Sequence, residues 1–128
     1  MRANEDNQWL YQNLWDIFQG VNRDYYHFKI EKMSMIQLLK YTAGDFFNWH
    51  MDLGPGKIST RKLTLIVHLS PEQDYDGGEL KWNPGFGEVP QTQGTVVIFP
   101  SYMPHTVKPV TRGERYTLVA WANGDAFQ

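Results

Sequence analysis

The feature that most constrains this fold is the alternation of apolar and polar residues in short segments from Tyr26 onward. Side chains of a β-strand point alternately to opposite faces, so a period of two predicts strands. We expect strands at residues 26–30, 33–41, 46–52, 61–69, 78–82, 95–100, 105–110 and 115–122, joined by turns that include 76–78, 83–87 and 111–114. Short strands at roughly 8–12-residue spacing predict an all-β sandwich, barrel or jelly roll.

Only the N-terminal segment has a helical period. Residues 6–19 carry apolar side chains at steps of three and four, from Trp9 to Phe18. This spacing predicts one amphipathic helix, and Gly20 is the expected end because glycine commonly follows the last helical turn.

Length and composition narrow the possible functions. A chain of 128 residues has the size of one domain, so we expect a single domain over residues 1–128. Its net charge of −2 argues against nucleic acid or an anionic membrane as the main partner. The absence of cysteine excludes disulfides, cysteine-ligated metals and a cysteine nucleophile. With neither a signal-peptide pattern nor an apolar span, a cytoplasmic location is the default expectation.

Two histidines and an aspartate form the strongest candidate for a chemical site. His50 and Asp52 lie two residues apart in a predicted strand, so their side chains should point to the same face. His105, at the start of a later strand, is the best third ligand. Two imidazoles and one carboxylate leave one face of an octahedral metal open, which is typical of non-haem Fe(II) oxygenases. A His-x-Asp pair also occurs by chance, and each histidine taken alone has a structural reading.

Arg115 begins the last predicted strand, on the face that also carries Thr117, Val119 and Trp121. A buried arginine needs an anionic partner, and no acidic residue lies on this face of the strand. A bound carboxylate would suit the planar guanidinium, which can donate two parallel hydrogen bonds. The alternative is an arginine at a strand end that faces solvent or pairs with Glu114.

Four ordered segments between residues 41 and 124 share a known pattern. Residues 41–52 read Y-x-x-G-x-x-F-x-x-H-x-D, and residues 61–70 read R-x-x-T-x-x-x-x-L-S. Residues 74–80 read DYDGGEL, and residues 94–115 end in HTVKPVTRGER. Together they resemble the Fe(II)/2-oxoglutarate-dependent dioxygenases, and within them the prolyl 4-hydroxylase-like group that includes bacterial PKHD-type hydroxylases.

The resemblance implies a double-stranded β-helix, or jelly roll, with one supporting N-terminal helix. It also implies that His50, Asp52 and His105 bind Fe(II), and that Arg115 holds the far carboxylate of 2-oxoglutarate. His68 stands where some prolyl hydroxylases have a tyrosine that contacts this carboxylate, although a buried structural histidine is the alternative. The other co-substrate contacts that it implies are Tyr41, Thr117 and the apolar wall positions Ile66, Leu80, Val107 and Trp121.

The activity that the resemblance implies is a 2-oxoglutarate-dependent hydroxylation. 2-Oxoglutarate and O2 would give succinate and CO2 while an unactivated C–H bond is hydroxylated, and ascorbate is a candidate reductant. Prolyl hydroxylation of a peptide or protein is the leading activity of the family, with a small-molecule substrate as the other option. No oligomeric state is predicted.

Two rival functions use the same residues. A cupin-like module would bind metal or a small carboxylate without turnover, but a bare metal binder would need neither Arg115 nor Tyr41. A zinc hydrolase would need a general base for the metal-bound water, for which Asp45 and Glu79 are the acidic candidates nearby in sequence.

Overall fold

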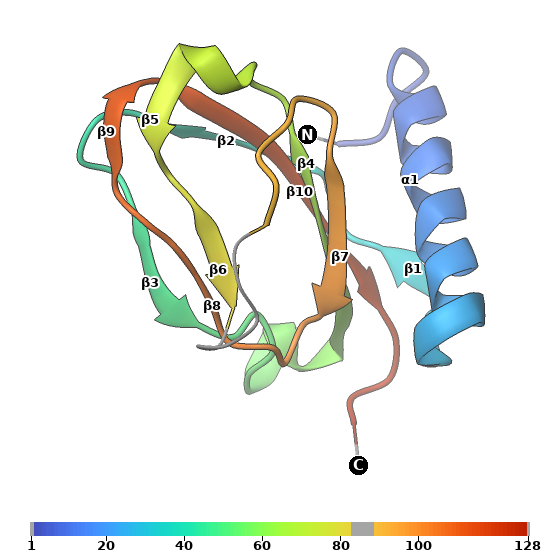
Figure 1. The fold of residues 1–128 in the computed structure, drawn as a ribbon. Helices are drawn as coiled ribbons and strands as arrows, with labels where there is room; N and C mark the ends of the chain where they lie inside the picture. The colour runs from blue at the N-terminus through green and yellow to red at the C-terminus, as the bar shows by residue number, and fades with distance from the viewer. Residues whose placement is uncertain (1, 83–88, 128) are drawn as a thin grey trace.

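Two facing layers of antiparallel strands, with one long helix outside them, form the protein (Figure 1). The structure, a computed structural model, describes residues 2–82 and 89–127. The larger sheet has the order β1-β10-β4-β7, and β2 also pairs with β10. The opposite layer holds the sheet β3-β8-β6 and the pair β5-β9. This architecture confirms the predicted all-β jelly roll with an N-terminal supporting helix.

The bounds of the elements follow the chain. The larger sheet contains β1 (Lys32–Met33), β2 (Gln37–Tyr41), β4 (Arg61–His68), β7 (Val96–Pro100) and β10 (Arg115–Asn123). The opposite layer contains β3 (Phe47–His50), β5 (Tyr75–Gly77), β6 (Leu80–Trp82), β8 (His105–Val107) and β9 (Val110–Gly113). The helical segments are α1 (Gln8–Val21), the π-helical η1 (Asn22–Tyr26) and the 3₁₀ turns η2 (Gly56–Thr60) and η3 (Glu72–Asp74).

The two central strands, β4 and β10, are buried on both faces. Leu63, Leu65 and Ala120 belong to the cluster beneath α1, which also includes Phe18. Residues of the opposite parity, such as Ile66 on β4, belong to the core between the layers. This alternation follows from the period of two and decides which side chains can reach the interior.

The N-terminal helix extends past its predicted end. Gly20 lies inside α1, and the chain continues through η1 until His27 adopts a left-handed backbone with φ 60°. No helix among residues 2–82 and 89–127 combines the length and apolarity required to cross a bilayer.

Residues 26–30 form no strand, contrary to their alternating pattern. The side chain of Asn22 supplies both hydrogen bonds that a neighbouring strand would give to Phe28. Its Oδ1 accepts from the Phe28 N–H and its Nδ2 donates to the Phe28 carbonyl, each at 2.7 Å. Tyr26, Phe28 and Ile30 still pack against the cluster beneath α1. The alternation therefore identified the buried side correctly, but not the backbone conformation.

The predicted hairpin between residues 105–110 and 115–122 is also wrong. β8 pairs with β3 and β6, whereas β9 pairs with β5, so most of residues 111–114 and 76–78 are strand and not turn. Gly77 and Gly113 have φ values of 78° and 76°, and a Cβ atom at Gly113 would collide with the Asp74 carbonyl oxygen. These glycines permit a close approach of two strands. The predicted turn at 83–87 lies outside the described residues.

Candidate metal centre and the pocket beside it

Three side chains able to ligate a metal meet at one end of the sheet β3-β8-β6. His50 ends β3 and His105 begins β8, and the two are cross-strand partners. Asp52 lies two residues beyond β3. One ligand atom from each of the three lies within 4.8 Å of the others. The structure therefore brings together the trio selected from the sequence.

Asp52 does not lie in a strand, so the predicted strand over residues 46–52 is too long. β3 ends at His50, and its register with β8 shifts between Phe47 and His50. The backbone N–H groups of Asp52 and Leu53 instead donate to the carbonyl oxygen of Ser101, at 2.9 and 3.0 Å. Contact with the chain after β7 therefore positions the carboxylate.

Backbone carbonyls set the orientation of both imidazole rings. Nδ1 of His50 lies 2.7 Å from the Asn48 carbonyl oxygen, and Nδ1 of His105 lies 3.0 Å from that of Met103. A carbonyl can only accept, so Nδ1 carries the proton and Nε2 keeps its lone pair. The two Nε2 atoms lie 3.2 and 3.5 Å from Oδ1 of Asp52.

This donor set fits a divalent cation. In the neutral tautomers, two nitrogen lone pairs face one carboxylate oxygen with no proton between them, and a metal ion would satisfy all three. Histidine ligands of metals usually donate their other N–H to a carboxylate, a backbone carbonyl or water, and both rings here lie against a backbone carbonyl. Burial lowers the pKa of His105, although the Asp52 carboxylate opposes the shift, so the ring is neutral and free to ligate at neutral pH.

A cavity of about 260 Å³ opens beside the trio. Its walls are mostly apolar, as expected where a ligand must be shielded from water. Ile66, Val107 and Trp121 line it, whereas Leu80 is a buried core residue outside the lining. Other lining residues include Leu39, Tyr41, Phe47, Met51, Arg61 and Val119.

Arg115 lies buried between the layers and is 2% exposed. It is the cross-strand partner of Tyr41, whose ring centroid is 5.0 Å from the guanidinium carbon. None of the ion pairs between described residues involves it, and its Nε has no hydrogen-bond partner there. Burial lowers the pKa of Arg115, while Tyr41 and Tyr75 oppose the shift. A Cβ atom at Gly78 would lie 2.8 Å from Cδ of Arg115, so the glycine makes room for this side chain.

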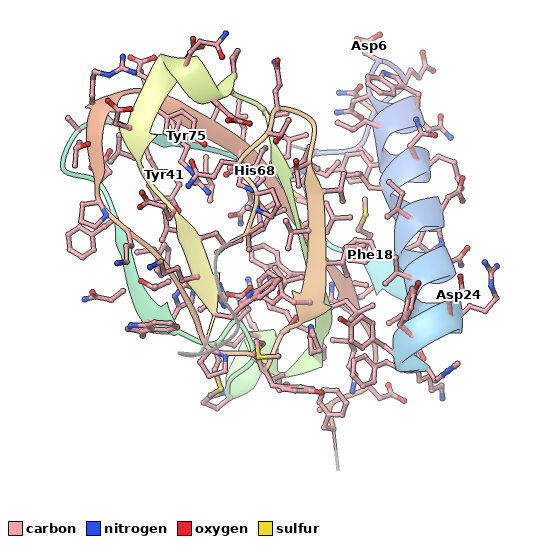
Figure 2. All side chains as sticks on the ribbon, viewed as in Figure 1. Asp6, Phe18, Asp24, Tyr41, His68 and Tyr75 are labelled. Carbon is pink, nitrogen blue, oxygen red and sulfur yellow. The ribbon has the colours of Figure 1, made fainter. Side chains whose placement is uncertain are left out.

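His68 lies in the same interior region as Tyr41 and Tyr75 (Figure 2). It is 1% exposed, and neither ring nitrogen has a hydrogen-bond partner among the described residues. Its cross-strand partner Thr117 is also 1% exposed. Burial, followed by the charge of Arg115, lowers the pKa of His68 to about 4. A neutral imidazole with a free N–H beside a buried cation is well suited to bind a carboxylate.

The pKa of His68 predicts a specific pH dependence of stability. Between an unfolded-state pKa of 6.5 and a folded-state value of about 4, only the unfolded chain binds the proton. The free energy of unfolding should therefore fall as the pH is lowered through this window, by on the order of 3 kcal/mol. Between pH 7 and pH 5, the free energy of unfolding measured in urea should fall less for His68→Phe than for the wild type.

A matched control for this prediction is His27→Asn, which removes an exposed histidine and tolerates the left-handed backbone. This variant should lose as much stability between pH 7 and pH 5 as the wild type does. An equal loss in His68→Phe would show that His68 does not cause the pH dependence.

Sequence reasoning missed three polar residues of this region. Tyr75 borders Arg115 from β5, a strand that the sequence reads as part of a turn. Thr64 and Ser101 lie beside Asp52 and are fully buried. The alternation of β4 was a usable signal for Thr64, because it places Thr64 on the same face as Ile66 and His68. No comparable signal marks Ser101.

The chain is similar to proteins of one known family. A family model described as the 2OG-Fe(II) oxygenase superfamily matches residues 36–123. A PKHD-type hydroxylase from Alteromonas mediterranea is 33% identical over 90 residues, which cover 64% of this chain and 40% of the relative. The matched region is therefore about two fifths of that relative.

Two solved structures share the fold. A prolyl-4-hydroxylase from Pseudomonas putida has a TM-score of 0.78 and 24% identity, and the match covers 97% of this chain and 69% of that one. A prolyl hydroxylase from Trichoplax adhaerens, in complex with a hypoxia inducible factor oxygen degradation domain peptide fragment, has a TM-score of 0.73 and 22% identity. That match covers 91% of this chain and 55% of the other.

Proposed function

The chain belongs to the 2OG-Fe(II) oxygenase superfamily, and on this basis we propose that it is an Fe(II)- and 2-oxoglutarate-dependent hydroxylase acting on prolyl residues of a peptide or protein. One observation carries the proposal. The trio of His50, Asp52 and His105 lies beside a cavity that Tyr41 also lines, and the Tyr41 ring centroid is 5.0 Å from the guanidinium carbon of the buried Arg115. Arg115 has no acidic partner among the described residues, so a metal-chelating dicarboxylate would satisfy both the trio and the arginine.

The trio and the buried arginine would have distinct tasks. His50, Asp52 and His105 would hold Fe(II), and 2-oxoglutarate bound to it would supply, with O2, the oxidising power for C–H hydroxylation while yielding succinate and CO2. Arg115 would hold the distal carboxylate by paired hydrogen bonds. Tyr41, His68 and Thr117 would donate further hydrogen bonds to the co-substrate.

The apolar walls would favour reaction with the substrate over reaction with water. Ile66, Val107 and Trp121 would exclude water from the reacting atoms. At the mouth, Phe47 and Met51 line the cavity and are 49% and 53% exposed. Such side chains can contact the apolar residues that flank a target proline. The names of the similar hydroxylases supply the prolyl specificity in this proposal.

The rival functions fit the structure less well. A cupin-like module that binds only a metal gives no role to the buried Arg115 beside Tyr41 and Tyr75. A hydrolase needs a general base, yet Asp52 is the only acidic residue among the described residues that line the cavity. Asp45, a candidate base in the sequence, is exposed and accepts hydrogen bonds from the backbone and hydroxyl of Thr42.

Anaerobic spectroscopy tests the proposal. Adding Fe(II) and then 2-oxoglutarate to the apoprotein should give a visible charge-transfer band, which His50→Ala should lack. Admitting O2 with a proline-containing peptide should then yield succinate and a peptide heavier by one oxygen atom. Iron binding without the band would favour the cupin-like alternative, and oxidation of free proline alone would replace the peptide by a small-molecule substrate.

A further inference from the structure

We propose that Thr64, Ser101 and Trp121 form a clamp on Oδ2 of Asp52, so that only Oδ1 is available to the metal. The inference rests on the proposed Fe(II) site, and it assigns positioning roles to residues outside the ligand trio. We call these three residues the Oδ2 clamp.

Two hydrogen bonds of the clamp converge on Oδ2 of Asp52, and a third supports one of them. The hydroxyl of Thr64 donates to Oδ2 at 2.8 Å, and the indole N–H of Trp121 donates to the same atom at 3.1 Å. The hydroxyl of Ser101 lies 3.0 Å from that of Thr64. Because Thr64 gives its only hydroxyl proton to Asp52, Ser101 must be the donor in this second bond, and the two bonds strengthen each other.

Burial makes the clamp effective. Thr64 and Ser101 are fully buried, and Asp52 and Trp121 are 7% and 8% exposed. Water therefore cannot replace these donors, and turning Oδ2 away would leave an indole N–H and a hydroxyl unsatisfied. The carboxylate is thereby held in one rotamer, with Oδ1 toward both histidines.

The clamp also ties the metal centre to the rigid larger sheet. Thr64 and Trp121 are cross-strand partners on β4 and β10, whereas Asp52 follows β3 of the opposite layer. Arg61 stacks on the Trp121 ring at 3.8 Å and donates to the Asp52 carbonyl at 3.3 Å, which fixes the indole. Three protein ligands with one atom each leave three positions of an octahedral ion free. A carboxylate that ligated through both oxygens would occupy one of them.

Metal binding to clamp variants tests the inference without requiring turnover. Thr64→Val keeps the shape of the side chain and removes the hydroxyl, whereas Thr64→Ser keeps the hydroxyl. Thr64→Val and Trp121→Phe should bind Co(II) and anaerobic Fe(II) about 10–100-fold more weakly. Their Co(II) visible spectra should differ from the wild type, because Asp52 can then present its second oxygen. Thr64→Ser should restore both properties.

A matched control is Thr106→Val, which removes another buried threonine hydroxyl, one that donates to the Phe47 carbonyl at 2.7 Å. It should keep the affinity and the spectrum of the wild type. Wild-type affinity and spectrum in both Thr64→Val and Trp121→Phe would overturn the clamp and leave the proposed activity standing. A wild type that binds metal but forms no succinate would overturn the activity and leave the clamp standing. A wild type that binds neither metal would overturn both.

Discussion

Replacing Asp52 by alanine should weaken Fe(II) binding more than about 100-fold. Losing a metal ligand should cost more affinity than losing a residue that only hydrogen-bonds to a ligand, which usually costs about 10–100-fold. The variant loses the carboxylate that lies 3.2 and 3.5 Å from the Nε2 atoms of His50 and His105. Succinate formation should disappear with the metal. Anaerobic titration with a competing chelator measures the affinity, and succinate release measures turnover.

Two variants separate ligand loss from misfolding. Asp52→Asn keeps an oxygen that can accept from Thr64 and Trp121, so it should stay folded while metal binding falls. Asp45→Asn changes an exposed acid seven residues away and should bind Fe(II) like the wild type. Unchanged affinity in Asp52→Ala would remove Asp52 from the metal centre.

Replacing Arg115 by methionine should raise the KM for 2-oxoglutarate by roughly 30–1,000-fold. This range corresponds to about 2–4 kcal/mol, the usual cost of removing one partner of a buried charge pair. Fe(II) affinity should stay within about twofold of the wild type, because Arg115 is not part of the ligand cluster. The thermal stabilisation by 2-oxoglutarate, measured anaerobically, should disappear.

The apoprotein provides a second readout for the same variant. Arg115 is 2% exposed and no acidic residue pairs with it among the described residues. In the ligand-free protein, the free-energy cost of removing its charge from water is therefore not offset by an ion pair. An apolar side chain of similar length should therefore keep or raise the Tm of the apoprotein. Arg112→Met, which removes an exposed arginine paired with Asp76 at 2.7 Å, should leave the KM unchanged. Equal losses of metal and co-substrate affinity in Arg115→Met would make Arg115 a structural residue.

The sequence already predicts the architecture and the main candidates. Alternation is a local property, so it marks the buried faces of β4 and β10 and places Arg115 on the same face as Thr117 and Trp121. The family-like spacing of His50, Asp52 and His105 likewise selects the trio that the structure brings within 4.8 Å. Periodicity suffices for the buried faces because it depends on neighbouring residues along the chain, and the resemblance to a known family is what joins the distant His105 to His50 and Asp52.

Only the tertiary structure decided which atoms of these residues are free to bind a metal and which are held by hydrogen bonds. Asp52 receives its side-chain hydrogen bonds from Thr64 and Trp121, 12 and 69 positions away, and Ser101 reaches Thr64 across 37 positions. The strand expected at residues 26–30 is absent because a single side chain, that of Asn22, satisfies the backbone of Phe28. Side-chain hydrogen bonds require remote segments to be placed to within a few tenths of an ångström, and no local pattern in the sequence encodes that placement.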